Sequence, residues 1–287
     1  MYLNIPTEIW LCILKMDIDS TINLLFTNKY FFDLFEFAKH NFNVLHEVIK
    51  RGYVHTLKYI DELENHNSLV FIEETSVHNK LKLACDHDQL PIVKYLVEKN
   101  NNVKNINGDI VIIASFYGRI NIVEYFIKKD IDNKTIFEAL TNACDNGHLE
   151  TMILLINNGA DVKAKDNFII KQAMSKGHLN IVKYLVENDV LIDFKDDTYI
   201  INSAQKGYYE MVKYLVFHGA DYRTVDDLPI RCALMCGHLD IVKYLQNLGA
   251  DIEADNEYTI DYVFKHGPKE SKEYLERYFY WNSLING

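Results

Sequence analysis

Four glycines stand 30 residues apart in this chain, at positions 147, 177, 207 and 237. Each opens a similar stretch, which is clearest in GHLNIVKYL from Gly177 and in GHLDIVKYL from Gly237. A fixed spacing of this size is typical of proteins built from stacked copies of one small structural unit. We therefore expect an array of repeats, and any function has to be compatible with that array.

Weaker copies extend the array in both directions. We call the glycine of this stretch the index position, and Asp88 takes its place in one copy. The spacing between the first two copies is longer and holds an insertion at about residues 64–77. The index positions are 52, 88, 118, 147, 177, 207, 237 and 267.

Each copy has the same internal pattern. A small residue, such as Ala173, lies four positions before the index glycine, which is expected to end a first helix in the left-handed conformation. A second helix follows, with Ile181, Val182 and Leu185 on one face. Such a helix-turn-helix unit cannot bury its apolar face alone, so its neighbours must cover it.

These residues resemble the ankyrin repeat. The pattern GHL-x-IV-x-x-L and the Gly-Ala-Asp-Val of residues 159–162 match the second half of that motif, and Leu228-Pro229-Ile230 before Ala233 is a trace of the first half. The resemblance covers roughly residues 42–280. It implies an all-α ankyrin repeat solenoid of about eight units, and the tail at residues 281–287 follows it.

The period of 30 is shorter than the usual ankyrin period of about 33. The missing residues fall in the loop between units, called the finger in ankyrin repeats, so we expect short fingers without β-hairpins. Short-fingered arrays rich in Asn, Ile and Tyr resemble those of giant DNA viruses of protists. This resemblance implies a viral protein that acts in the host cytoplasm.

Residues 1–40 do not fit the repeat, and two interpretations remain open. They can form a helical cap that closes the array. Alternatively, Pro6, Ile9, Ile13 and Leu14 resemble the opening of an F-box, which implies binding to the Skp-type adaptor of a cullin ubiquitin ligase. The aromatic segment 274–281 is expected to cover the opposite end of the array.

Composition narrows the class of partner. The chain carries 30 Lys plus Arg against 41 Asp plus Glu, a net charge of -11, which disfavours nucleic acid as a ligand. Its five scattered cysteines indicate reduced thiols of an intracellular protein. The longest uncharged apolar run, residues 110–118, is too short to span a bilayer, so we expect a protein that does not enter membranes. We also expect it to be a monomer.

No residue pattern indicates an enzyme, a metal centre or a cofactor site. Cys232, Cys236 and His238 have no matching second pair of ligands nearby in sequence, as a closed zinc site would require. His148, His178 and His238 share one slot of the repeat, and each is expected to hydrogen-bond to the neighbouring unit. The sequence also lacks a phosphate-binding glycine loop and a nucleophile elbow.

The fingers are the feature that differs most between copies. Stacking would place equivalent fingers roughly 10 Å apart, near one Debye length, so their carboxylates should form an acidic strip. This strip is either a solvated surface or a docking surface for a basic segment of a partner protein. Its predicted residues are Asp193, Asp196, Asp197, Asp226, Asp227, Glu253, Asp255 and Glu257.

The sequence therefore predicts a non-enzymatic scaffold for protein–protein interaction. The alternative is a substrate-recognition adaptor of a ubiquitin ligase, in which the N-terminal segment binds the Skp-type adaptor and the array selects the substrate.

Overall fold

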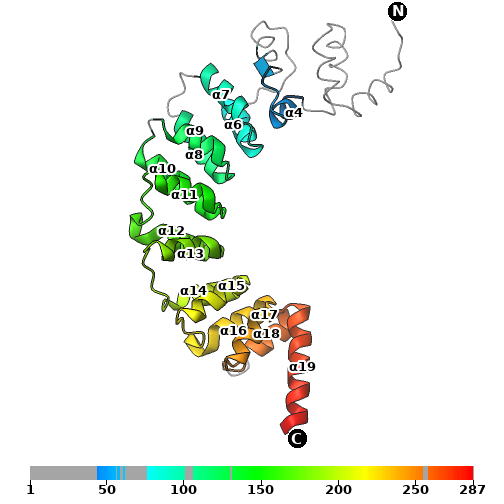
Figure 1. Cartoon of the computed structure of the whole chain (residues 1–287). Coiled ribbons are helices and arrows are strands. Elements are labelled where there is room, and N and C mark those ends of the chain that lie inside the picture. Colours follow the sequence, from blue (N-terminus) through cyan, green and yellow to red (C-terminus); the bar gives the residue numbers. More distant parts are fainter. Residues whose placement is uncertain are drawn as a thin grey trace, which may run out of the picture. The chain divides into compact units, whose positions relative to one another are not determined.

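The computed structural model describes residues 44–55, 57–58, 61, 76–100, 106–129, 131–254 and 258–286. Within these residues the chain forms fifteen helices and no strand, which confirms the all-α expectation (Figure 1). The chain divides into two compact units, Met1–Ala139 and Leu140–Gly287, and the boundary falls inside one helix. The predicted N-terminal segment, residues 1–40, lies outside the described residues.

The described helices of the first unit come in pairs, as the repeat pattern predicts. The unit contains α4 (Val44–Lys50), α6 (Val77–Asp86), α7 (Leu90–Lys99), α8 (Ile106–Phe116), α9 (Ile120–Ile127) and the start of α10 (Asn133–Asp145).

The second unit continues the pairing and ends in a helix of 18 residues. It contains the end of α10, followed by α11 (Leu149–Asn157), α12 (Ala164–Lys176), α13 (Leu179–Glu187), α14 (Asp197–Lys206), α15 (Tyr209–Phe217), α16 (Thr224–Cys236), α17 (Leu239–Asn247), α18 (Tyr258–His266) and α19 (Lys269–Asn286).

The index glycine ends the first helix of a pair, as predicted. At Gly147 the backbone is left-handed, with φ of 77°, a conformation that only glycine adopts without a Cβ clash. The Gly147 N–H donates to the carbonyl of Cys144 at 3.0 Å, and the next N–H, of His148, donates to the carbonyl of Ala143 at 2.9 Å. This is a Schellman motif, which pairs carbonyls that the helix end leaves free. Asp88, which replaces the glycine in one copy, is also left-handed, with φ of 53°.

The same glycine also gives room to a side chain of the following repeat. An added Cβ on Gly147 would lie 2.9 Å from the His178 ring, closer than real Cβ contacts allow. Nε2 of His178 lies 3.0 Å from the carbonyl of Asp145 and donates to it, and His238 makes the same bond to Gln205. The prediction that the histidines bond to the neighbouring repeat is thus confirmed for His178 and His238. Where Tyr208 fills this slot, Lys206 donates to the equivalent carbonyl, that of Ser175.

Gly267 departs from this pattern. Pro268 follows it and has no N–H, so the second bond of the Schellman motif cannot form. Gly267 is accordingly absent from the left-handed glycines, and its N–H instead donates to the carbonyl of Val263 at 2.8 Å. Pro268 cannot make the bond to the preceding repeat that His178 and His238 make. Ser271 makes such a bond instead, because its hydroxyl donates to the carbonyl of Leu234 at 2.7 Å.

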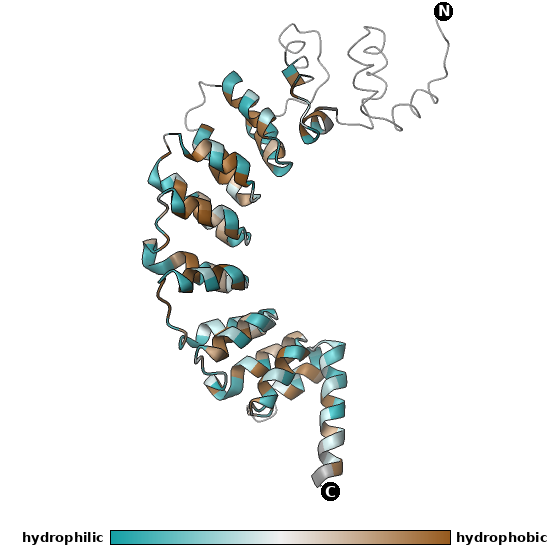
Figure 2. Ribbon diagram, in the orientation of Figure 1, coloured by the Kyte–Doolittle hydropathy of each residue, from teal (hydrophilic) through white to brown (hydrophobic). Residues whose placement is uncertain are grey.

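The apolar face of the second helices forms the core within each unit. Ile181, Val182 and Leu185 are fully buried, and so are Ile241 and Val242. Figure 2 shows hydrophobic residues gathered on the sides of the helices that face their neighbours within a unit. Burial of each such side chain contributes about 1.5–3 kcal/mol, so stacking of the helix pairs is what stabilises the array.

The last helix covers its end of the array only in part. Tyr274, Tyr278 and Phe279 pack against the core of the second unit, as predicted. Tyr280 and Trp281, in contrast, are 62% and 61% exposed. The prediction that the aromatic segment covers the end is therefore confirmed for Tyr274, Tyr278 and Phe279, and it is wrong for Tyr280 and Trp281, because the helix continues past the core.

Candidate functional site

Four short segments of the second unit lead from one helix pair into the next, and we call them the fingers; three of them include the first residues of α12, α14 and α16. They comprise residues 161–167, 191–197, 221–227 and 251–257, of which residues 255–257 lie outside the described part. None of the described finger residues forms a strand, in agreement with the expected short fingers. The side chains of the fingers together make up a surface that we call the finger edge.

Each finger contains a turn held by an aspartate, at its first residue in three fingers and at its third residue, Asp193, in the finger 191–197. The carboxylate of Asp161 accepts a hydrogen bond of 2.9 Å from the backbone N–H of Lys163. The same turn forms at Asp193, Asp221 and Asp251, again with the N–H two residues later and at 2.9–3.0 Å. Such side-chain turns mimic a backbone turn, so the fingers are fixed locally by the residues that also give them charge.

Two fingers contain three consecutive left-handed residues. Residues 165–167 have φ of 52–58°, and residues 225–227 have φ of 51–57°. A basic side chain further along the same helix holds each turn. Lys171 bonds the carboxylate of Asp166 at 2.7 Å, and Arg231 donates to the carbonyls of Asp226 and Val225 at 2.8 and 3.0 Å.

The finger between these two is built differently. Ile201 occupies the position of the basic residue, so no side chain can hold a left-handed turn there. Instead Asp196 caps α14, since its carboxylate accepts bonds from the backbone N–H of Thr198 at 3.0 Å and from the Thr198 hydroxyl at 2.6 Å. An aspartate at this position is a strong helix N-cap.

Hydrogen bonds also connect consecutive fingers of the second unit. The Asn167 amide donates to the carbonyl of Leu191 at 3.1 Å. The Thr224 hydroxyl donates to the carboxylate of Asp197. The Tyr222 hydroxyl donates at 2.8 Å to the carbonyl of Leu248, which lies at the end of α17, before the last finger begins. Each contact joins residues at least 24 positions apart in sequence, and the first two connect the fingers 161–167, 191–197 and 221–227 to one another.

The predicted acidic residues divide into four groups, of which the last is the buried Asp227 alone. Asp193, Asp196 and Asp226 are exposed, while Asp197 and Glu253 are half-buried. Asp255 and Glu257 lie outside the described residues, so their place stays a prediction.

Asp227 does not belong to the exposed surface, and this corrects the sequence-based expectation. It is only 3% exposed and forms a bidentate ion pair with Arg223, at 3.1 and 3.2 Å. The left-handed backbone at Asp227, with φ of 57°, accompanies this pairing. The pair neutralises one acid and one base, so the acidic surface rests on the carboxylates that remain exposed.

The sequence reasoning missed two exposed apolar residues of the second unit. Leu191 is 80% exposed and Phe217 is 84% exposed. Leu191 stands where other fingers have Asp161, Asp221 or Asp251, and this break in the repeat is the signal that could have identified it. Phe217 adjoins His218, whose ring stacks on Phe194 of the finger at a centroid distance of 4.7 Å.

The remaining candidate residues are possible metal ligands and thiols. In the described part of the chain, no three His, Cys, Asp or Glu side chains are grouped so that they could hold a metal ion. Burial raises the pKa of Cys85 and of Cys144 to about 12, so both thiols stay protonated and unreactive. Pro6, Ile9, Ile13 and Leu14, the F-box-like residues, lie outside the described residues.

None of the helices in the described ranges is both long and apolar enough to cross a membrane.

Comparison with known proteins agrees with the repeat geometry. A family model described as ankyrin repeats in three copies matches residues 81–166 and 170–256, more than half of the chain. The chain is 90% identical over 287 residues to ankyrin repeat protein R791 of Acanthamoeba polyphaga mimivirus, and the match covers all of both proteins.

Two more distant relatives match part of the array. Ankyrin repeat protein R844 of the same virus is 36% identical over 119 residues, which are 40% of this chain and 55% of the relative. Ankyrin repeat protein R840 is 37% identical over 109 residues, or 37% of this chain and 20% of the relative. The predicted likeness to viral ankyrin arrays is confirmed. With its helix pairs, its index glycines and these matches, the chain belongs to the ankyrin repeat family.

Proposed function

We propose that this protein is a non-enzymatic scaffold whose finger edge binds a basic segment of another protein. The observation that carries the proposal is the connection between the fingers 161–167, 191–197 and 221–227, made by the bonds of Asn167 to Leu191 and of Thr224 to Asp197. Connected fingers present their side chains at fixed spacing, and a preorganised surface loses less entropy on binding than a mobile one.

The charge of this surface favours a basic partner. Asp193, Asp196 and Asp226 are exposed on adjacent fingers, and so are Asp221 and Asp251. The fingers 191–197 and 221–227 contain two cations, Lys195 and Arg223. Arg223 pairs with Asp227, so Lys195 is the cation that remains beside the exposed carboxylates. Neighbouring carboxylates of one sign raise the rate of encounter with a cationic segment and select against acidic ones.

The finger carboxylates are assigned to binding and not to catalysis. Asp193, Asp221 and Asp251 each accept a backbone hydrogen bond within their own finger, and Asp196 caps a helix. These bonds use one side of each carboxylate and leave the other oxygen turned to solvent or to a partner. Such fixed anions suit contact with Lys or Arg side chains.

The adaptor alternative rests on residues 1–40, so it stays a prediction from sequence. The repeat relatives are viral proteins, and we therefore place the partner of the scaffold in the host cytoplasm.

Photo-crosslinking tests which surface meets the partner. A benzophenone amino acid would replace Leu191, in a finger, or Glu150, an exposed residue of α11 away from the fingers. Both full-length proteins would be irradiated in a host-cell extract. We expect a discrete adduct with a protein containing a basic segment from position 191 and none from position 150. Equal labelling from both positions, or none from position 191, would contradict the proposal.

A further inference from the structure

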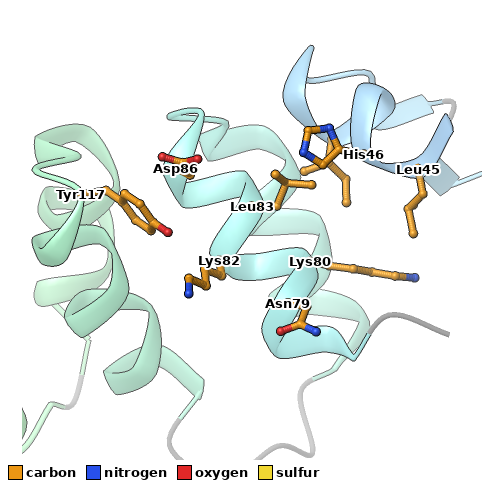
Figure 3. A pocket seen from close by; sticks show the side chains of 9 residues that line it. Leu45, His46, Asn79, Lys80, Lys82, Leu83, Asp86 and Tyr117 are labelled. Carbon is orange, nitrogen blue, oxygen red and sulfur yellow. The ribbon is translucent and has the colours of Figure 1, made fainter. Parts of the chain in front are cut away.

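A hollow of about 310 Å³ lies within the first unit. It extends over the exposed side of α6, between α4 and the end of α8 (Figure 3). Its walls are formed by Leu45, His46, Ile49, Asn79, Lys80, Lys82, Leu83, Asp86 and Tyr117. This volume is at the lower limit of ligand pockets, so it suits a single side chain of a peptide.

The floor of the hollow is apolar. Leu45 and Ile49 of α4 are 3% and 1% exposed and belong to the core of the first unit. Leu83 of α6 is half-buried and lies beside His46 in Figure 3. An apolar side chain placed here would leave water, which favours its binding.

One side of the rim carries polar groups that no other described residue uses. Lys82 is exposed, and its ammonium group has no hydrogen bond or ion pair within the described part of the chain. The Tyr117 hydroxyl has no hydrogen bond there either, and Figure 3 shows it directed from the end of α8 toward α6. Burial raises the pKa of Tyr117, with a further contribution from Asp86, so this hydroxyl stays protonated and can donate.

The other charged groups at the hollow are already paired. Asp86 has Arg119 at 3.9 Å and His87 at 4.0 Å, and Arg119 also donates to the carbonyl of Cys85 at 3.1 Å. Lys80 lies 3.6 Å from the buried carboxylate of Asp61. The hollow therefore offers one uncommitted cation and one donor hydroxyl, which complement an anion.

We propose that this hollow anchors a peptide segment of a partner protein in which an apolar side chain is followed by a carboxylate. The apolar side chain would occupy the floor, and the carboxylate would accept from Lys82 and from the Tyr117 hydroxyl. The first unit would thus bind an acidic–apolar segment, whereas the finger edge of the second unit binds a basic one.

Fluorescence anisotropy with short labelled peptides tests this site on the full-length protein. The probe has the sequence Gly-Ser-Phe-Glu-Ser-Gly, and its matched variants carry Gln for Glu or Ala for Phe. We expect saturable binding of the probe, about fivefold weaker binding of the Gln peptide and at least about tenfold weaker binding of the Ala peptide.

A double-mutant cycle assigns the carboxylate to Lys82. Lys82→Gln should lower the affinity for the Glu peptide about fivefold and leave the affinity for the Gln peptide unchanged, since the protein change and the peptide change remove the same contact. Tyr117→Phe should likewise lower the affinity for the Glu peptide and leave the affinity for the Gln peptide unchanged. Lys176→Gln, at an exposed lysine of α12, is the matched control and should change neither affinity. Circular dichroism verifies that every variant keeps its helices.

Three results would overturn the proposal. One is the absence of saturation by the wild type up to about 1 mM peptide, a concentration that corresponds to a binding free energy of about -4 kcal/mol. Another is an equal effect of Lys82→Gln on the Glu and Gln peptides. A third is a wild-type dimer in sedimentation that Lys82→Gln dissociates, since the occupant would then be a second copy. Substitutions in the finger edge should leave these affinities unchanged, so this site and the proposed function can fail separately.

Discussion

Arg223 holds the buried carboxylate of Asp227 through two hydrogen bonds, from Nε to Oδ1 at 3.1 Å and from Nη2 to Oδ2 at 3.2 Å. The two residues lie four positions apart, on either side of the start of a left-handed turn. Planar bidentate pairing of this kind is the strongest form of ion pair that side chains make. The pair gives Asp227 a structural role, and it leaves the finger edge with its remaining exposed carboxylates.

This assignment decides how the finger edge can be tested. Substitution of Asp227 would disturb folding and binding together. Asn substitutions at Asp193, Asp196 and Asp226 separate the two effects, because Asn forms the same side-chain turns and N-caps as Asp and tolerates a left-handed backbone.

Gly147 should tolerate alanine less well than Gly159 does. Both are left-handed, with φ of 77° and 95°, so either alanine carries a backbone strain of about 1–2 kcal/mol. An added Cβ on Gly159 meets nothing within 4 Å, whereas on Gly147 it lies 2.9 Å from His178. We expect Gly147→Ala to lower the free energy of unfolding by about 1 kcal/mol more than Gly159→Ala in urea titrations.

The double variant Gly147→Ala/His178→Ala verifies the cause. Removing the ring should recover part of the extra loss. If the two single alanine variants were equally stable, the contact between His178 and Gly147 would have no energetic weight.

Val225→Asn should stabilise the protein. Val225 is 58% exposed and has φ of 51°, a conformation that β-branched residues rarely adopt. Asn tolerates this region, so relief of the strain should raise the free energy of unfolding by about 1 kcal/mol. Val225→Ala is the matched control and should give a smaller gain. A loss of stability in the Asn variant would mean that the left-handed turn at residues 225–227 does not form in solution.

The repeat architecture could be predicted from the sequence because one backbone requirement recurs. A left-handed helix end needs glycine, so the four index glycines report the position of each first helix directly. The small residue before each glycine, such as Ala143, is likewise a constant, since its carbonyl closes the Schellman motif inside the core.

The finger edge was predicted only in outline, because its details depend on contacts between neighbouring copies. Asp197 and Asp227 occupy equivalent positions, yet one accepts from Thr224 and the other pairs with Arg223. The partner of Asp227, Arg223, stands four positions before it, whereas Asp193 stands four positions before Asp197. The difference follows from Lys171 and Arg231, which support left-handed turns, and from Ile201, which cannot. The hollow over α6 was missed for a similar reason, since it joins residues from three helices.

Cys236 should be the most reactive thiol of the described part of the chain. It is exposed, whereas Cys85 and Cys144 are buried and have pKa values of about 12. At pH 8 only about one in ten thousand of the buried thiols is ionised, and the thiolate is the form that reacts. In a Cys12→Ser variant, iodoacetamide should modify Cys236 first, as read by peptide mass spectrometry. Rapid labelling of Cys85 or Cys144 under native conditions would contradict the described burial.

The N-terminal segment needs its own test, since residues 1–40 lie outside the described residues. If the F-box resemblance reflects function, the full-length protein retains a Skp-type adaptor in a pull-down. Ile9→Asp should then abolish retention, because an apolar contact cannot accommodate an unpaired carboxylate. Asp17→Ala, a change of similar size at a residue without a role in the resemblance, serves as control. Absence of retention by the wild type would leave only the cap interpretation.

The most direct test of the finger edge is the affinity of a basic peptide. A labelled peptide of three Lys-Ser-Arg-Ser repeats would be titrated with the wild type and with the triple variant Asp193→Asn/Asp196→Asn/Asp226→Asn. The control, Glu150→Gln/Glu187→Gln/Glu276→Gln, removes the same charge from exposed helix positions. We predict that the Asn variant binds about tenfold more weakly with a flatter salt dependence, and that the control stays within about twofold of the wild type. Equal losses in the two variants would show that only net charge matters, and would contradict the assignment of the finger edge as the binding surface.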